Sequence, residues 1–76
     1  MFSYNIARCA DQTAFLRTCA WVESGIKELQ KMPLLTDVDG TQVQVYRVQG
    51  KRIKVVNDYE VDAVYVESEV ELDGIK

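Results

Sequence analysis

The hydrophobic residues between Asp11 and Met32 recur with the period of an α-helix. They lie alternately four and three positions apart, at Phe15, Cys19, Val22, Ile26 and Leu29. This spacing places apolar side chains along one helical face. Asp11 can cap the first turn, and Pro33 cannot continue a helix because it lacks a backbone N–H. The pattern therefore predicts one long helix over 11–32 whose apolar face needs a partner.

Most of the remaining chain alternates apolar and polar residues, as strands do. Residues 2–6 predict a short N-terminal strand, and residues from 41 onward predict an antiparallel meander. A three-residue loop ending at Gly50 would pair Val45 with Ile53. Continued through a loop at 57–59, this register gives an inner face of Val43, Val45, Ile53, Val55, Val61, Ala63 and Tyr65. We expect a single α+β domain over 1–76: an N-terminal strand, one long helix, then an antiparallel β-meander packed on the helix.

Composition narrows the classes of function. The chain has no histidine and two cysteines, so it lacks the commonest general base and cannot assemble a usual four-ligand zinc site. Neither a membrane-spanning apolar run nor a secretion-signal pattern is present. We expect a cytoplasmic protein with no membrane partner, no cofactor and no enzymatic activity, in which Cys9 and Cys19 are reduced core thiols.

The charge is concentrated near the C-terminus. Seven acidic residues and one basic residue follow Asn57, a net charge of −6 in a chain whose total is −3. On a strand, residues two apart are about 6.5–7 Å apart. The acidic row thus resembles the phosphates of a DNA strand in spacing, and it consists of Glu67, Glu69, Glu71 and Asp73. It is either a docking surface or a solvated strand face that protects a sheet edge from aggregation.

Two other surfaces are candidates for partner binding. The hairpin 47–54 carries Arg47, Lys51 and Arg52, with Tyr46 beside them, which could contact phosphates and stack a base. On the helix, Trp21 stands among small residues on the flank of the apolar face. This tryptophan either caps the edge of the core or anchors a partner.

The segment Asp37-Val38-Asp39-Gly40-Thr41 has two interpretations. It resembles the first motif of the haloacid dehalogenase phosphatases, which implies a nucleophilic Asp37, an acid/base Asp39 and bound magnesium. That family also has a Rossmann-like domain and further motif residues, for which little chain remains after Thr41. Asp-Gly between apolar flanks is also a preferred hairpin turn, because Gly accepts a positive φ. We favour the turn.

The function that these patterns favour is a small acidic binding module. It would dock on a basic patch of a larger protein and modulate or inhibit it, as nucleic-acid mimics do. The alternative is a nucleic-acid-binding or regulatory protein that uses the hairpin 47–54. A third hypothesis is a metal-dependent phosphohydrolase acting through Asp37 and Asp39. A homodimer is a further option, because meander sheets have open edges.

Overall fold

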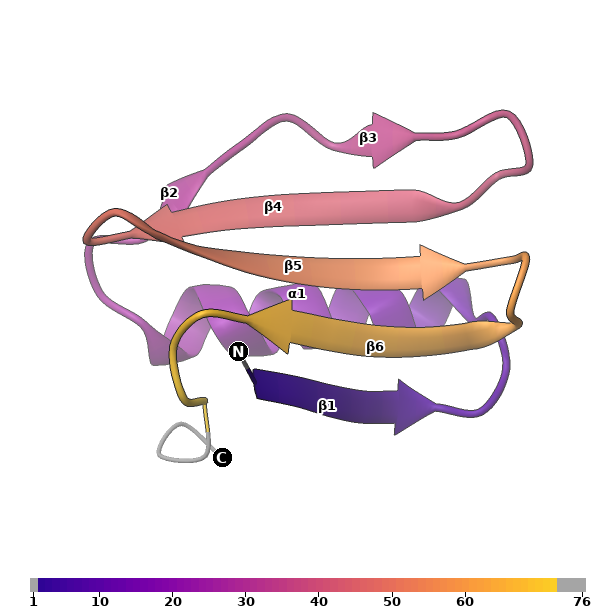
Figure 1. The fold of residues 1–76 in the computed structure, drawn as a ribbon, viewed down its shortest axis with the longest axis horizontal. Helices are drawn as coiled ribbons and strands as arrows, with labels where there is room; N and C mark the ends of the chain where they lie inside the picture. The colour runs from indigo at the N-terminus through magenta and orange to yellow at the C-terminus, as the bar shows by residue number, and fades with distance from the viewer. Residues whose placement is uncertain (1, 73–76) are drawn as a thin grey trace.

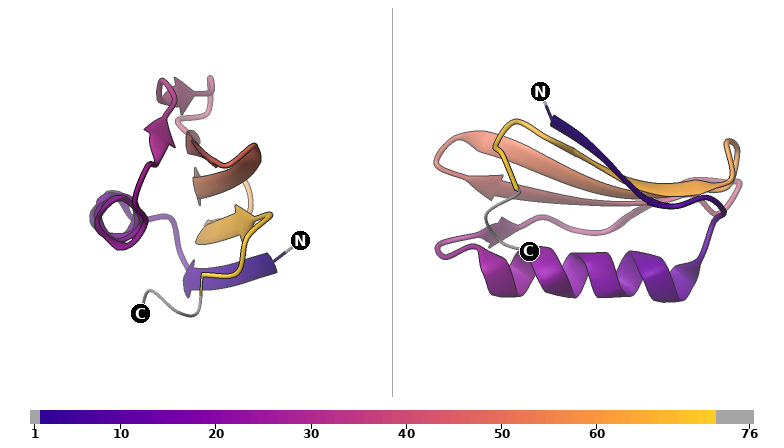
Figure 2. Two further views of the ribbon diagram at one scale, coloured as in Figure 1. Left: turned by 90° about the vertical axis from the view of Figure 1, so that its left-hand side faces the viewer. Right: turned by 90° about the horizontal axis from the view of Figure 1, so that it is seen from below.

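A computed structural model describes residues 2–72, which form a six-stranded antiparallel sheet with one helix on one of its faces (Figure 1). The elements are β1 (Phe2–Ala7), α1 (Gln12–Gly25), β2 (Gln30–Lys31), β3 (Leu35–Thr36), β4 (Gln42–Val48), β5 (Lys51–Asp58) and β6 (Ala63–Ser68). The strand order is β1-β6-β5-β4-β2, and β3 also pairs with β4. Figure 2 shows α1 running along a single face of the sheet. The α+β class, with strand, helix and meander in that order, is confirmed.

The helix begins where the sequence predicts and ends earlier. The carboxylate of Asp11 accepts hydrogen bonds from the backbone N–H groups of Thr13 and Ala14, at 2.9 and 3.3 Å. The prediction that the helix extends to residue 32 is wrong, because α1 ends at Gly25. Glycine is a poor helix former, and Ile26 is already extended, with φ −125° and ψ 126°. Residues 26 and 29 are apolar because they pack on the core from the irregular connection after the helix. Their spacing extends the apolar pattern of the sequence beyond the end of α1.

The first hairpin has a different register from the predicted one. Gln49 and Gly50 both have positive φ, 51° and 78°, as a two-residue hairpin turn requires. The turn is closed by Val48 and Lys51, so Tyr46, rather than Val45, pairs with Ile53. A shift of one residue reverses the two faces of a strand. The prediction that Val43 and Val45 face the helix is therefore wrong.

The second hairpin turns later than predicted. Its loop lies between the paired residues Asp58 and Ala63, and Val55 pairs with Val66. Val61 is in the loop and 65% exposed, so its predicted place on the inner face is wrong. Lys54 stands opposite Glu67. The long β5–β6 pairing takes up residues that the predicted loop at 57–59 would have left out of the sheet.

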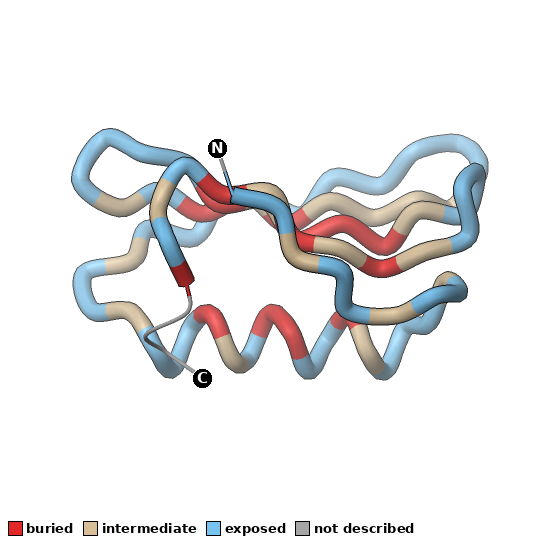
Figure 3. Tube along the Cα trace, turned by 60° about the horizontal axis from the view of Figure 1, so that its bottom comes forward, coloured by how far each residue is buried: buried red, intermediate tan, exposed pale blue. Residues whose placement is uncertain are grey.

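The core lies between α1 and the middle of the sheet (Figure 3). Three helix residues, Phe15, Cys19 and Val22, supply its helical side. The remaining buried members are Tyr46, Ile53, Val55, Val64, Val66 and Leu72. Leu72, which follows β6, is 1% exposed, and its N–H donates to the Tyr4 hydroxyl at 2.9 Å. The last described residues therefore close one end of the core.

The two edges of the sheet are built differently. Among residues 2–72, strand β1 pairs only with β6, so its other side is open. At the opposite edge, β2 and β3 are two residues each and both pair with β4. Pro33 lies between them, and the N–H of Met32 donates to the Val45 carbonyl at 2.9 Å. Short, proline-interrupted edge strands are poor templates for further pairing.

Candidate functional site

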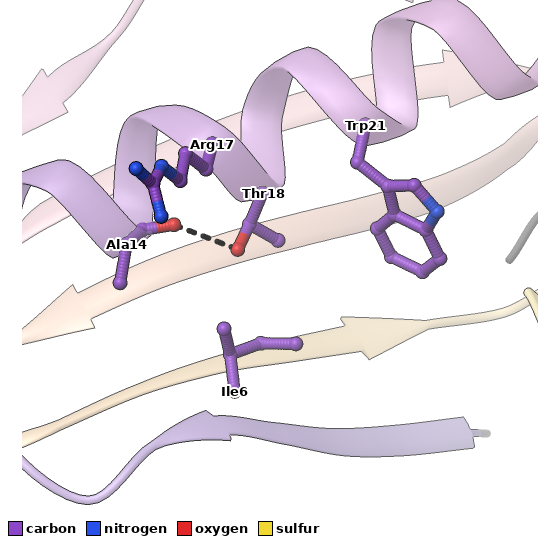
Figure 4. A pocket seen from close by; sticks show the side chains of 5 residues that line it. All are labelled: Ile6, Ala14, Arg17, Thr18 and Trp21. Atoms are coloured by element: carbon purple, nitrogen blue, oxygen red, sulfur yellow. Dashed lines mark hydrogen bonds between the residues drawn. The ribbon is translucent and has the colours of Figure 1, made fainter.

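A groove runs between α1 and the open strand β1 (Figure 4). On the helix side, Ala14, Thr18 and Trp21 follow one another at steps of four and three, so they share one flank of α1. The Thr18 hydroxyl donates to the Ala14 carbonyl at 2.8 Å, within the helix. Because this hydroxyl is already satisfied, the helical wall of the groove behaves as a largely apolar surface.

The strand side of the groove is supplied by Ile6. The register of β1 against β6 shifts between Asn5 and Ala7, so Ile6 is the extra residue of a β-bulge. A bulge changes the direction in which a side chain points. Ile6 stands opposite the helical wall (Figure 4) and is 39% exposed. The groove is thus apolar on both sides.

One cation borders this apolar groove. Arg17, which is exposed, completes the lining. The described ion pairs involve Lys31, Arg52 and Lys54, so Arg17 has no ionic partner among residues 2–72. The pocket measures about 440 Å³, within the range of sites that take small ligands. Its chemistry suits an apolar group joined to an anion.

A second pocket, of about 410 Å³, lies on the other side of α1 and contains a polar cluster. The buried Tyr46 hydroxyl donates to Glu23 Oε2 at 2.6 Å, and Lys31 Nζ lies 3.2 Å from the same oxygen. The Tyr46 hydrogen bond, supported by Lys31, lowers the pKa of Glu23. Burial and the Glu23 hydrogen bond raise the pKa of Tyr46. The cluster ties the helix to β4 and β2.

The cysteine in this second pocket is chemically quiet. Burial raises the pKa of the Cys19 thiol, with a smaller contribution from Glu23. A protonated thiol is a weak nucleophile. Cys9 is exposed, and both cysteines are free, so the prediction of two core thiols is right for Cys19 and wrong for Cys9. The pocket does not bring a thiolate into reach of a substrate.

The structure separates the members of the predicted acidic row. Strand β6 ends at Ser68, so Glu69 and Glu71 are not on the same strand as Glu67. Glu67 pairs with Lys54 at 3.6 Å, and Glu69 pairs with Arg52 at 3.6 Å. Glu71 is exposed and makes no described ion pair, while Asp73 lies outside the described residues. The row is not a continuous line of free carboxylates.

The basic hairpin 47–54 is exposed at its tip but lacks the predicted aromatic platform. Arg47 and Lys51 are exposed, whereas Arg52 is engaged by Glu69 through its side chain and its backbone N–H. Tyr46 is 0% exposed. The hypothesis that Tyr46 stacks a base beside these cations is wrong, because the one-residue shift in register turns it into the core.

The acidic pair Asp37 and Asp39 lies in a turn. Asp37 Oδ1 accepts from the Val38 N–H at 2.7 Å, and Asp39 Oδ1 accepts from the Thr41 N–H at 2.9 Å. The Thr41 hydrogen bonds lower the pKa of Asp39. Gly40 has φ 91°, as the turn interpretation requires. Within residues 2–72, no group of three or more acidic, cysteine or histidine side chains is placed to hold a metal, so these donors do not fit the magnesium that the resemblance implies.

Two residues that line the groove, Ile6 and Arg17, are not among the site residues predicted from the sequence. Arg17 lies on the same helical flank as Ala14 and Trp21, and counting that flank for charge as well as size would have found it. Ile6 lies in the predicted strand 2–6, and nothing in the sequence indicates the bulge at this residue. The groove therefore contains Trp21, which the sequence singles out, in a setting that only the fold defines.

Comparison with known proteins identifies no relative of this chain. No family model, curated protein or solved structure matches the chain. Within the part of the chain that the structure describes, no helix has the length and apolar character needed to cross a membrane. The groove and its surroundings are therefore the features of the molecule that bear on function.

Proposed function

We propose that this protein is a non-catalytic binding module that docks on a larger protein through the groove between α1 and β1. The observation that carries the proposal is the conjunction of an open strand with an apolar pocket of about 440 Å³ beside it. Trp21 forms part of the wall, and tryptophan is among the residues enriched at binding hot spots. Neither Asp37 nor Cys19 is arranged for chemistry, which favours binding over catalysis.

The acidic end of the chain contributes attraction over longer distances in this proposal. The residues after Asn57 carry a net charge of −6 in a chain whose total is −3, and this charge would draw the chain toward a basic patch on the partner. Glu67 and Glu69 already have cationic partners, so their pairs would have to open for direct contact. The groove would supply the anchor, and the charge would mainly raise the association rate.

The groove can be tested by filling it. A tagged chain captures its partner from the source cell, and the partner is then purified and titrated by calorimetry. Ala14→Met adds bulk inside the groove, whereas Ala20→Met makes the same change at an exposed helix position that borders the second pocket. We expect Ala14→Met to weaken binding about tenfold or more and Ala20→Met to leave it unchanged.

The two variants would also show if the groove is not the binding site. Circular dichroism must show the parent fold for both, since methionine is a good helix former. Equal affinity of parent and Ala14→Met would remove the groove from the interface. Loss of binding in Ala20→Met alone would transfer the site to the pocket at Cys19 and Glu23.

A further inference from the structure

We propose that the groove accepts an extended acidic segment of the partner, which adds to the sheet as a new strand along β1. This inference rests on the proposed function and specifies the form and charge of the ligand. The added segment would hydrogen-bond to β1 through its backbone. It would place an apolar side chain between Ile6 and Trp21 and a carboxylate on Arg17.

The open edge of β1 offers backbone groups for pairing. Strand β1 has six residues, Phe2–Ala7, and none of them is charged or proline. Charge, proline, short length and bulges are devices that usually prevent pairing at an edge, and of these β1 has only the bulge at Ile6. The opposite edge uses two of them, with two-residue strands on either side of Pro33. The bulge at Ile6 leaves Phe2–Asn5 in regular register with β6, so a regular stretch of open backbone remains.

The position of the groove allows it to accept a side chain of the added segment. A segment paired with β1 would send alternate side chains toward the face that carries α1. The pocket lies on that face, between β1 and α1 (Figure 4). Peptides that add to a sheet edge gain affinity from main-chain hydrogen bonds and specificity from pockets for alternate side chains. Both elements are present here, side by side.

The charge of the segment follows from the cations at this edge. Arg17 borders the groove, and Arg8, which directly follows β1, borders a neighbouring pocket together with Asp62. Neither arginine belongs to a described ion pair, and among residues 2–72 the groove lining includes no acidic residue. An arginine can bind a carboxylate through two parallel hydrogen bonds. The local charge of the groove is thus opposite to the net charge of the chain, and it selects an acidic ligand.

A second copy of this chain fits the groove less well. Pairing two β1 strands would bring no carboxylate to Arg17, because Phe2–Ala7 contains no acidic residue. Each strand would also bring its bulge at Ile6 to the junction, and bulges at an edge act against edge-to-edge pairing. An acidic segment from a different protein can supply that carboxylate, and it brings no second bulge to the junction.

The test selects ligands without assuming a partner. The full chain is panned against a random peptide library displayed on phage, and the enriched peptides are synthesised and titrated by fluorescence anisotropy. We expect an apolar residue and an Asp or Glu two positions apart, since such residues share one face of a strand. A lack of enrichment, or an enriched motif without an acidic residue, would overturn the proposal.

Charge exchange then tests the contact with Arg17. Arg17→Glu should weaken the acidic peptide about tenfold or more, and a peptide with Lys in place of its acidic residue should recover affinity for that variant. Arg47→Glu makes the same charge change on β4, away from the groove, and should have little effect. Equal weakening by the two variants would show a general charge effect and would overturn the assignment to Arg17.

Methylation of peptide nitrogens tests strand addition. Two forms of the selected peptide carry N-methyl groups on alternate residues, one form on each edge of the extended strand. We expect one form to lose about tenfold or more in affinity and the other to bind like the parent. If both bind like the parent while Arg17→Glu still loses affinity, strand addition is wrong and docking in the groove stands.

The same measurements separate the other occupants. If no selected peptide responds to Arg17→Glu or to Ala14→Met, the groove is not the binding site, and the proposed function fails with the inference. Sedimentation of the unliganded parent should show no self-association that selected peptides dissociate. A dimer that these peptides dissociate would make the second copy the occupant and would overturn the assignment to a partner segment.

Discussion

The two edges of the sheet differ in how well they are protected against pairing with another strand. At the edge formed by β2 and β3, each strand has two residues and Pro33 separates them. The segment is nevertheless held against β4, where Gln44 Nε2 donates to the Met32 carbonyl. At the other edge, β1 runs for six uncharged residues, and no strand among residues 2–72 pairs with its outer side.

An unprotected sheet edge is stronger evidence for a binding site when a groove lies beside it. The β2–β3 edge is interrupted, and the pockets beside it, of about 410 and 280 Å³, include the Glu23–Lys31 ion pair and the turn at Asp37. The β1 edge lies beside the more apolar groove, whose Arg17 has no ionic partner among residues 2–72. This combination of an open edge and an apolar groove supports the binding site proposed above.

The largest expected effect is a difference in amide hydrogen exchange between β1 and β4. With β2 and β3 in place, β4 has strand partners on both sides, whereas β1 has a partner on one side only within the described residues. Amides of β4 should approach the global free energy of unfolding, and solvent-facing amides of β1 should exchange almost freely, a separation of about 5 kcal/mol or more. NMR exchange measurements on the free protein test this expectation.

The amides of β4 that face residues 30–36 decide the outcome. If they exchange as fast as the open amides of β1, the interrupted segment does not protect its edge, and the contrast between the two edges disappears. The amides of β5 are the internal reference, since β5 lies between β4 and β6.

The next effect concerns the helix, which supplies the second wall beside β1. Val22 is 0% exposed and faces the sheet. Val22→Ala should lower the free energy of unfolding by about 1–3 kcal/mol, because it removes buried methyl groups and leaves a cavity. Leu16→Ala, at a helix position that is 55% exposed, should stay within about 0.5 kcal/mol of the parent. Urea denaturation of both variants tests the pair, and similar losses would mean that the buried face of α1 has been assigned incorrectly.

A third experiment opens the protected edge. Pro33→Thr restores a backbone N–H and favours one continuous strand from β2 to β3. We expect stronger self-association than in the parent, measured by sedimentation velocity, because a longer edge strand is a better template. Leu34→Thr, which keeps Pro33 and changes a neighbouring exposed residue, serves as the control. Identical sedimentation of Pro33→Thr and the parent would show that proline is not what protects this edge.

The smallest effect is a pH dependence at the attachment of β2 to the helix. The Tyr46 hydrogen bond and Lys31 lower the pKa of Glu23 in the folded chain. A carboxyl group with a lowered pKa stabilises the folded state above its unfolded pKa, about 4.3 for glutamate, and loses this contribution as pH falls through the folded pKa. Glu23→Gln should therefore flatten the acid limb of stability against pH. Glu28→Gln, in the exposed connection after α1, should not, and an unchanged acid limb in Glu23→Gln would contradict the assignment.

Part of the fold could be predicted because it depends on neighbours in the chain. The cap at Asp11, the four-and-three spacing of Phe15, Cys19 and Val22, and the turn at Gly40 are local features, and each is confirmed. The order of strand, helix and meander follows from such features. Trp21 could likewise be assigned to a flank of the helix with small neighbours, since helical spacing alone determines that flank.

Local spacing, capping and charge counts are enough to predict the α+β class, the start of the helix and the acidic C-terminal quarter. The buried face of β4, in contrast, depends on how this strand pairs with β5. Both faces of that strand have apolar residues, and the positive φ of Gln49 and Gly50 shortens the turn by one residue, which turns Tyr46 inward. Tertiary pairing also produced the groove, since Ile6 and Trp21 belong to different elements, and their approach depends on a bulge against β6 and on the packing of α1. Contacts between residues that are distant in the sequence do not show as a periodic pattern of apolar residues. For that reason the open edge and its groove could not be predicted from the sequence.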